Sequence, residues 1–217
     1  MEIQIKLPGV KLGVVGAQDV HVEAQHAELT KLLDEVCTRK QKEFTVERLA
    51  EADSIRDIRA LFRGWGMDPS KYRPASEALL RRVVQGKGLY RVSNVVDIGN
   101  LVSIETGWPL GCYDQSRISE PVELRHGLAG ENYEGIGKKN WNLEGRPALA
   151  DPSGPFGSPI SDSTRTMITD SAKNVLIVIY VPEKSPDASA EFAMKRLGER
   201  LTAFAGAHTT TSTICRA

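Results

Sequence analysis

The sequence predicts an α+β fold, and three observations support that prediction. Two N-terminal segments alternate apolar and polar residues, as half-buried strands do. Several later stretches repeat apolar residues at helical spacing. The run Val175–Tyr180 is apolar on both faces, which is typical of a fully buried central strand. Because these strands and helices follow in no regular strand–helix–strand alternation, they favour α+β over a doubly wound parallel fold.

The N-terminal elements follow from local spacing. Strands are expected at 3–7 and 10–14, separated by a Pro-Gly turn. Helices are expected over 23–42, over 54–63 before Gly64, and over 74–85 before Gly86. In the third helix Ala75, Ala78, Leu79 and Val83 form the expected apolar face, with Arg81 and Arg82 opposite.

The remaining elements are shorter until the central strand. The pattern predicts a helix over 94–105 and strands near 121–125 and 148–150. Pro182 ends the central strand, 183–189 is expected to be a loop, and an amphipathic helix over 190–205 closes the chain.

Composition excludes several classes of protein. The chain has 217 residues, of which 41% are hydrophobic and 26% charged, so a disordered chain is excluded. Lys plus Arg and Asp plus Glu are 28 each, which argues against binding nucleic acid by bulk charge and against a DNA-binding role. No apolar run approaches the roughly 20 residues that span a bilayer, and no export signal is visible. Three widely spaced cysteines suit a reducing compartment. We expect a cytoplasmic protein without membrane contact.

Charge is nevertheless unevenly distributed along the chain. Residues 39–91 contain 13 Lys or Arg against 7 Asp or Glu, whereas residues 97–162 contain 5 against 10. The split predicts either a basic face that meets a polyanion or two halves that neutralise each other across an internal contact.

Cofactor, metal and nucleophile signals are weak. Gly9, Gly13 and Gly16 lack the spacing of a dinucleotide loop, and the four histidines lack metal-ligand spacing, so no cofactor and no metal are expected. Cys112 has only His126 as a nearby base in the sequence, which favours a buried structural cysteine over a nucleophile.

Two polar segments are candidate binding elements. Residues 151–166 contain glycines and prolines that fix a loop, which presents Asp162, Ser163, Thr164, Arg165 and Thr166 together. This set can hold an amino group, a carbonyl and hydroxyls. The alternative is a loop that satisfies itself, with Asp162 accepting from backbone amides and Arg165 paired with an acidic neighbour. On the helix over 94–105, Asp97, Asn100 and Ser103 share one face, which faces either solvent or a pocket.

The segment NVVDIGNLVSIETGWPLGCYD, followed by VELR, AGE, LAD and NVLIVIY, resembles the B3/B4 editing domain of the bacterial phenylalanyl-tRNA synthetase beta subunit. The lead-in DPSKYRPASEALLRR resembles that of free-standing relatives. Matching positions are Asn94, Asp97, Asn100, Gly107, Pro109, Asp114, Arg125, Gly130, Glu131 and Asp151. The resemblance covers about residues 68–181 and implies a mixed α/β sandwich with a central mixed sheet flanked by helices. We expect a single domain over 1–217, with 1–67 and the helix 187–205 packed on that core.

The resemblance implies hydrolysis of wrongly charged tyrosyl-tRNA by a positioned water. Three positions depart from the family pattern: Gly99 replaces a threonine, Gly111 a histidine and Val178 a glutamate. The double-glycine loop is replaced by Asp162–Thr166. Tyrosine specificity therefore does not carry over, and the catalytic residues stay unassigned.

We expect a pocket rebuilt for another aminoacyl group or another ligand, in which Arg165→Ala abolishes ligand binding or hydrolysis. The expected substrate-binding residues are Asn100, Ser103, Asp162, Ser163, Arg165 and Thr166, and the residues expected to contact RNA phosphates are Arg81, Arg82, Lys87 and Arg91. The sequence thus predicts a stand-alone domain that hydrolyses mischarged aminoacyl-tRNA in trans. The alternatives are a non-catalytic module that binds tRNA or a small molecule, and a cysteine-dependent hydrolase that uses Cys112.

Overall fold

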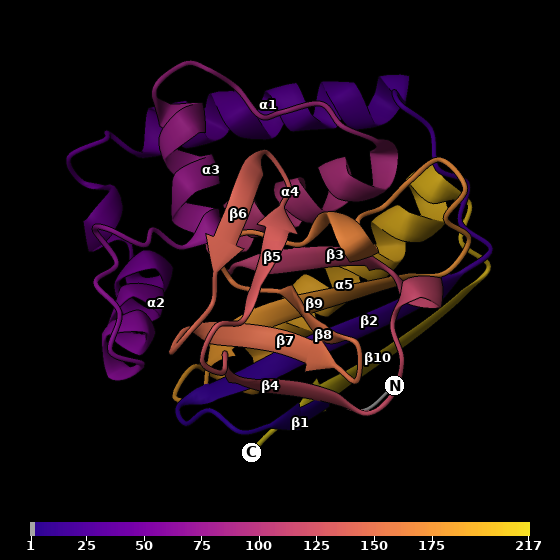
Figure 1. Cartoon of the computed structure of the whole chain (residues 1–217). Coiled ribbons are helices and arrows are strands. Elements are labelled where there is room, and N and C mark those ends of the chain that lie inside the picture. The colour runs from indigo at the N-terminus through magenta and orange to yellow at the C-terminus, as the bar shows by residue number, and fades with distance from the viewer. Residues whose placement is uncertain (1–2) are drawn as a thin grey trace.

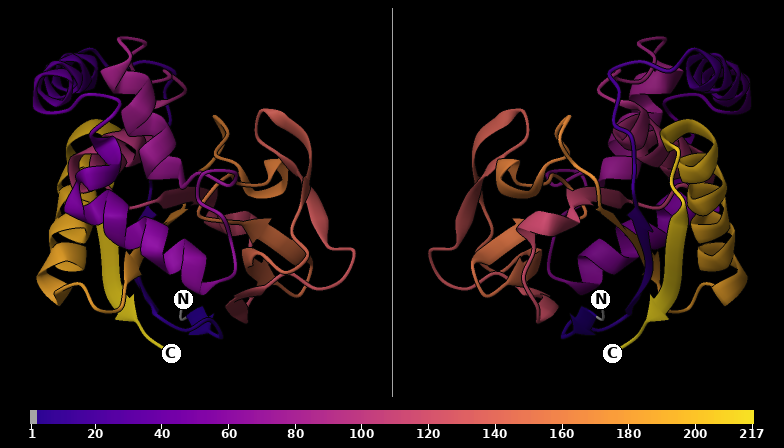
Figure 2. Two further views of the ribbon diagram at one scale, coloured as in Figure 1. Left: turned by 90° about the vertical axis from the view of Figure 1, so that its left-hand side faces the viewer. Right: turned by 90° about the vertical axis from the view of Figure 1, so that its right-hand side faces the viewer.

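Two four-stranded sheets stack against each other, and helices cover the outer face of one of them (Figures 1 and 2). The computed structural model describes residues 3–217, with the side chains at 138, 139, 209 and 210 left out. One hydrophobic core runs through both sheets and the helices. The prediction of an α+β sandwich is confirmed.

The sheet next to the helices is antiparallel throughout. Its strand order is β10 (Thr209–Cys215), β2 (Val10–Gln18), β9 (Val175–Pro182) and β3 (Leu110–Asp114). All eight residues of β9 are buried, because helices cover one face of this sheet and the second sheet covers the other. The prediction of a fully buried central strand is confirmed.

The second sheet contains the mixed pairing. Its order is β1 (Ile3–Ile5), β4 (Val122–His126), β7 (Pro147–Asp151) and β8 (Gly154–Gly157), with β1 parallel to β4 and the other pairs antiparallel. A separate hairpin of β5 (Asn132–Gly135) and β6 (Lys138–Asn142) extends beyond this sheet (Figure 1).

The described residues contain five α-helices and three short 3₁₀ segments. The helices are α1 (Ala27–Glu43), α2 (Asp53–Gly64), α3 (Ala75–Val84), α4 (Asn94–Thr106) and α5 (Asp187–Ala205), and the 3₁₀ segments are η1 (Leu49–Glu51), η2 (Gln115–Arg117) and η3 (Thr164–Thr166). Ser93 caps the start of α4 by accepting a hydrogen bond from the Val96 amide, and Gly107 ends it with a φ of 79°. No helix within residues 3–217 is long and apolar enough to cross a bilayer.

Three expectations about local structure were wrong. The helix expected over 190–205 begins at Asp187, inside the expected loop 183–189, and it does not close the chain because β10 follows it and pairs with β2. The segment 151–166 is not a loop throughout, because β8 pairs with β7 and η3 follows. Pro155 is tolerated in β8 because β8 is an edge strand. The expected apolar face of α3 was also wrong: Ala78 is exposed, whereas Glu77 is buried and paired with Arg59 at 2.8 Å, which neutralises its charge.

Candidate functional site

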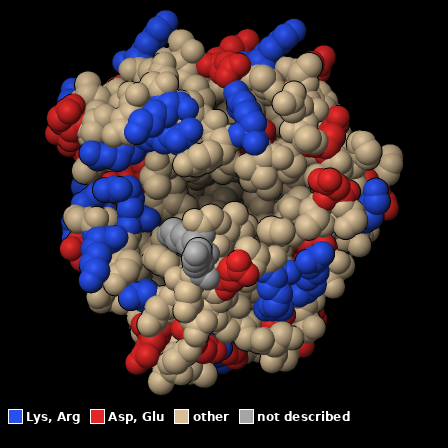
Figure 3. Space-filling view, turned by 45° about the horizontal axis from the view of Figure 1, so that its top comes forward, with Lys and Arg blue, Asp and Glu red and all other residues tan. Residues whose placement is uncertain are grey.

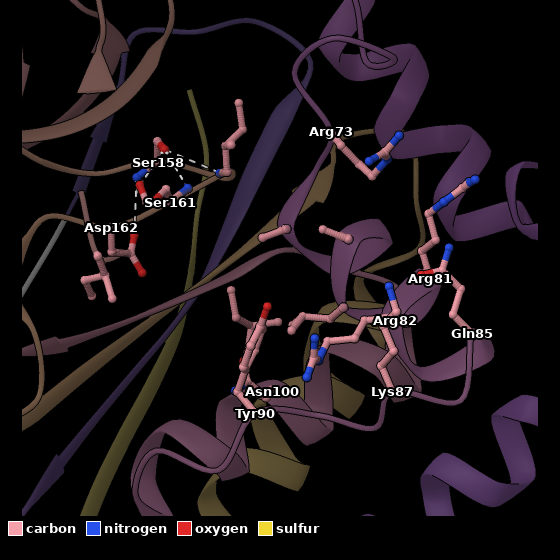
Figure 4. Close-up of a pocket in the computed structure, with 16 residues that line it drawn as sticks. Arg73, Arg81, Arg82, Gln85, Lys87, Tyr90, Asn100, Ser158, Ser161 and Asp162 are labelled. Carbon is pink, nitrogen blue, oxygen red and sulfur yellow. Dashed lines mark hydrogen bonds between the residues drawn. The ribbon is translucent and has the colours of Figure 1, made fainter. Parts of the chain in front are cut away.

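A cavity of about 550 Å³ lies between α3, α4, the start of β3 and the loop 158–162, beside the tip of the β5–β6 hairpin. Figure 3 shows the hollow, and Figure 4 shows the side chains around it. The lining residues are Arg73, Ala75, Ala78, Leu79, Arg81, Arg82, Gln85, Lys87, Tyr90, Asn100, Leu110, Ile136, Ser158, Ile160, Ser161 and Asp162.

One side of the cavity is basic. Leu80 and Val83 of α3 are buried in the core, so Arg81 and Arg82 lie on other faces of the helix and reach the cavity. Lys87 follows the turn that ends α3. No acidic side chain within the described part of the chain forms an ion pair with these three cations. Their charge is therefore available to an anionic ligand.

The opposite side is a tightly hydrogen-bonded loop that ends at Asp162. The Ser158 hydroxyl donates to the Ser161 carbonyl at 2.8 Å and accepts from the Ile160 and Ser161 amides. Tyr133 donates its hydroxyl to the same carbonyl, and the Ile136 amide donates to the Asp162 carbonyl at 2.9 Å. These bonds fix the loop against the hairpin, so the Asp162 carboxyl has a defined position.

Asp162 is the acidic group of this cavity. Burial raises the pKa of its carboxyl to about 7, although hydrogen bonds from the Tyr113 hydroxyl and from backbone amides favour the charged form. The Tyr113 hydroxyl donates to Oδ1 of Asp162 at 2.7 Å, and the Ser158 amide approaches it at 3.4 Å. A carboxyl with this pKa gains or loses its proton near neutral pH.

Two glycines make room for the Tyr113 hydroxyl. A Cβ at Gly111 would lie 1.9 Å from this oxygen, and a Cβ at Gly157 would lie 2.2 Å from it. Gly111 pairs with Val178 across β3 and β9. Two of the positions that the resemblance marks as departures are therefore cross-strand neighbours. The third, Gly99, also has no space for a side chain, since its Cβ would lie 2.5 Å from the Cys112 sulfur.

Of the six expected substrate-binding residues, Asn100 and Asp162 line the cavity together. The Asn100 side chain forms no hydrogen bond with any other described residue, so its amide is available to a ligand. Within the DSTRT segment only Asp162 reaches the cavity wall.

The structure places Arg165 outside the cavity. Its guanidinium binds both oxygens of Asp151, at 2.9 and 3.1 Å, and the Gly154 carbonyl at 3.1 Å. Burial raises the pKa of the Asp151 carboxyl, but Arg165 and neighbouring amides hold it below its ordinary value. This geometry matches the alternative in which Arg165 pairs with an acidic neighbour. The same bonds join η3 to the β7–β8 hairpin.

The other three expected substrate-binding residues also have structural partners. Ser163 caps η3 by accepting from the Arg165 amide at 3.1 Å. The buried Thr166 donates to the Phe156 carbonyl at 3.5 Å. Ser103 is 1% exposed and donates to the Trp108 carbonyl at 2.8 Å, because it lies on the core side of α4.

Three of the four residues expected to contact RNA lie together at the cavity, namely Arg81, Arg82 and Lys87. The fourth, Arg91, is instead paired with Asp34 of α1 at 2.6 Å. Between the basic segment 39–91 and the acidic segment 97–162, the described residues form one ion pair, Arg39–Glu105 at 3.9 Å. The two segments therefore do not neutralise each other through a network of ion pairs.

Sequence reasoning missed two aromatic residues at the site. Tyr113 holds Asp162, and Tyr90 lines the cavity while remaining 55% exposed. The alternation in 110–114, which puts Gly111 and Tyr113 on one face of a strand, is a signal that could have found Tyr113. Tyr90 lies in an irregular segment without a pattern of its own.

The surroundings of Cys112 disfavour the cysteine-dependent hydrolase that the sequence left as an alternative. Burial, with a smaller contribution from the nearby Asp162 charge, raises the pKa of the Cys112 thiol well above its ordinary value. A nucleophilic cysteine needs the opposite shift. Among the described residues, no three His, Cys, Asp or Glu side chains are grouped as metal ligands.

Comparisons with known proteins identify the family that this chain resembles. The model of the B3/4 domain family matches residues 58–197. The chain is similar to the phenylalanine–tRNA ligase beta subunits of Thermobifida fusca (31% identical, 58% of this chain, 15% of the relative), Streptomyces avermitilis (33%, 42% and 11%) and Neisseria meningitidis serogroup A (26%, 46% and 14%). It therefore corresponds to a small part of these curated relatives. An N-terminal fragment of the Pyrococcus horikoshii phenylalanyl-tRNA synthetase beta subunit aligns with all of this chain and 54% of its own, at 13% identity and a TM-score of 0.47.

Proposed function

This chain belongs to the B3/4 domain family, and on that premise we propose that it binds aminoacyl-tRNA and hydrolyses the ester bond of a mischarged one in trans. The observation that carries the proposal is the polarity of the cavity. Asp162 lies on one side, and three unpaired cations, Arg81, Arg82 and Lys87, lie on the other.

An aminoacyl-tRNA end has the complementary order of charges. The amino acid carries an ammonium group, and the ribose that bears it is joined to phosphates. The ammonium binds Asp162 in its ionised form, whereas the phosphates bind the cations of α3 and of the turn that follows it. The volume of about 550 Å³ falls in the range of small-molecule sites.

The chemical step is addition of water to the ester carbonyl carbon. The bond between that carbon and the ribose oxygen then breaks, the ribose oxygen takes a proton, and the amino acid leaves with a new carboxyl group. Asn100 is a cavity residue whose side-chain amide is available to orient the water or to donate to the carbonyl oxygen. The Ser158 hydroxyl is already engaged within its own loop.

The test is deacylation of a panel of charged tRNAs by the purified chain. We expect hydrolysis of a subset of the panel and a fall in rate for Asn100→Ala. Asn132→Ala is the matched control, because Asn132 is an exposed amide on β5 whose side chain donates to the Gly130 carbonyl, outside the cavity. Failure to hydrolyse any charged tRNA would rule out the hydrolytic function.

A second function, binding without hydrolysis, is favoured by one observation. Among the residues that the structure describes, the cavity wall contains neither a histidine, the most frequent general base, nor a cysteine, and the Ser158 hydroxyl is engaged within its own loop. This alternative predicts tRNA binding that weakens steeply with salt while the ester bond stays intact.

A further inference from the structure

Tyr90 is an exposed aromatic residue at the edge of the cavity, in the segment that joins α3 to α4. It is 55% exposed, whereas its neighbour Leu89 is 7% exposed and packs in the core. On the other side, Arg91 is paired with Asp34 at 2.6 Å. Tyr90 thus follows a residue that is packed in the core, while its own ring is exposed at the cavity.

Arg82 contacts the face of this ring. Its guanidinium carbon lies 4.0 Å from the ring centroid, and its Nε is buried without a hydrogen-bond partner among the described atoms. Figure 4 shows Tyr90 beside Arg82 at the cavity. A cation over one face of an aromatic ring fixes the ring and leaves its remaining surface for a second planar group.

The surroundings of Tyr90 indicate which planar group fits. Arg81 and Lys87 line the same cavity, and within the described chain neither forms an ion pair with a carboxylate. Aromatic side chains interleaved with unpaired cations are the pattern by which proteins hold single-stranded nucleic acid, with bases stacked on the rings and phosphates on the cations.

We propose that Tyr90 is the stacking surface for the 3′-terminal base of the bound RNA. The proposal deepens the proposed function and rests on it, because it takes the ligand to be a tRNA end rather than a free amino acid. Stacking on Tyr90 places the terminal ribose toward the interior of the cavity, where Asn100 and Asp162 lie. A base-stacking residue therefore selects a nucleotide-linked substrate over a free amino acid ester.

The experiment measures binding of uncharged RNA, which separates it from hydrolysis. Fluorescence anisotropy compares a 5′-labelled RNA that ends in CCA with the same RNA lacking its last base, at a low salt concentration of about 50 mM. Tyr90→Leu should weaken binding of the intact RNA by about fivefold to 150-fold, the range for loss of one stacked base. It should change binding of the abasic RNA much less.

Two variants serve as controls. Tyr90→Phe keeps the ring and should bind within about threefold of the natural protein. Val92→Ala alters a residue that is equally exposed, at 55%, in the same segment but does not line the cavity, and it should bind both RNAs unchanged.

The outcomes distinguish the two proposals. If Tyr90→Leu lowered the affinity for intact and abasic RNA equally, stacking would be overturned. The ring would then affect binding only by positioning Arg82. Unchanged binding by Tyr90→Leu, or no RNA binding by the natural protein, would overturn it as well. A Tyr90-dependent preference for the intact end in a protein that hydrolyses no charged tRNA would support stacking while the hydrolytic function fails.

Discussion

Replacing Asp162 by asparagine isolates the contribution of one ionisable group to stability. Asparagine has the same shape and keeps an oxygen that can accept the hydrogen bond from Tyr113, which measures 2.7 Å in the natural protein. It cannot bind or release a proton in this pH range. The difference between the two proteins therefore reports the titration of Asp162.

The magnitude follows from the pKa of this carboxyl. Burial raises it to about 7 in the folded protein, whereas it is about 3.9 in an unfolded chain. Between these values the folded state binds a proton that the unfolded state does not, so stability falls as pH rises. The contribution is complete below about pH 4 and is lost as pH rises through about 7, with a change of about 2 kcal/mol between pH 5 and pH 7.

Urea unfolding of both proteins at a series of pH values measures this change. The natural protein should lose about 2 kcal/mol relative to Asp162→Asn from pH 5 to pH 7. Tyr113→Phe removes a bond that favours the charged carboxylate, so it should shift the same transition to higher pH. A difference between the two proteins that stays constant with pH, or that grows in the opposite direction, would refute the reasoning.

Three further substitutions test the geometry around the cavity. Gly111→Ala places a Cβ 1.9 Å from the Tyr113 hydroxyl, so we expect a loss of about 1–3 kcal/mol in urea unfolding; adding Tyr113→Phe should recover part of it, and no recovery would contradict the contact. Arg165→Ala leaves the buried carboxylate of Asp151 unpaired, so the free energy of unfolding should fall by about 2–4 kcal/mol while tRNA binding is retained. A loss of tRNA binding without a loss of stability would instead place Arg165 at the ligand. Arg81→Gln should reduce the slope of log K against log salt by about one, whereas Arg91→Gln, already ion-paired, should leave it nearly unchanged.

The elements that the sequence predicts well are those whose stability depends on a strong local pattern. The helices over 27–43, 53–64 and 187–205 have clear apolar faces, and β9 is apolar throughout. By contrast, β10 has the sequence TTTSTIC, in which hydroxyl side chains obscure the alternation. It forms a strand because β2 offers a full set of hydrogen-bond partners beside it, which is a tertiary effect.

The site depends more strongly on contacts between distant residues. The sequence shows that Asp162 and Arg165 are near each other, but it does not show that they face different partners. Arg165 of η3 binds Asp151 at the end of β7, whereas Asp162, in the loop after β8, binds Tyr113 of β3, which belongs to the other sheet. Such pairings are set by how the sheets stack, and no local spacing encodes them.

The position of β2 in its sheet has a consequence for how the chain folds. β2 ends at Gln18, yet its neighbours on both sides, β9 and β10, begin at Val175 and Thr209. Contacts of such high sequence separation slow folding, and they leave an apolar strand unpaired until residues 175–215 have also been synthesised. During synthesis, the segment 10–18 is therefore the part of the nascent chain that chaperones are most expected to shield.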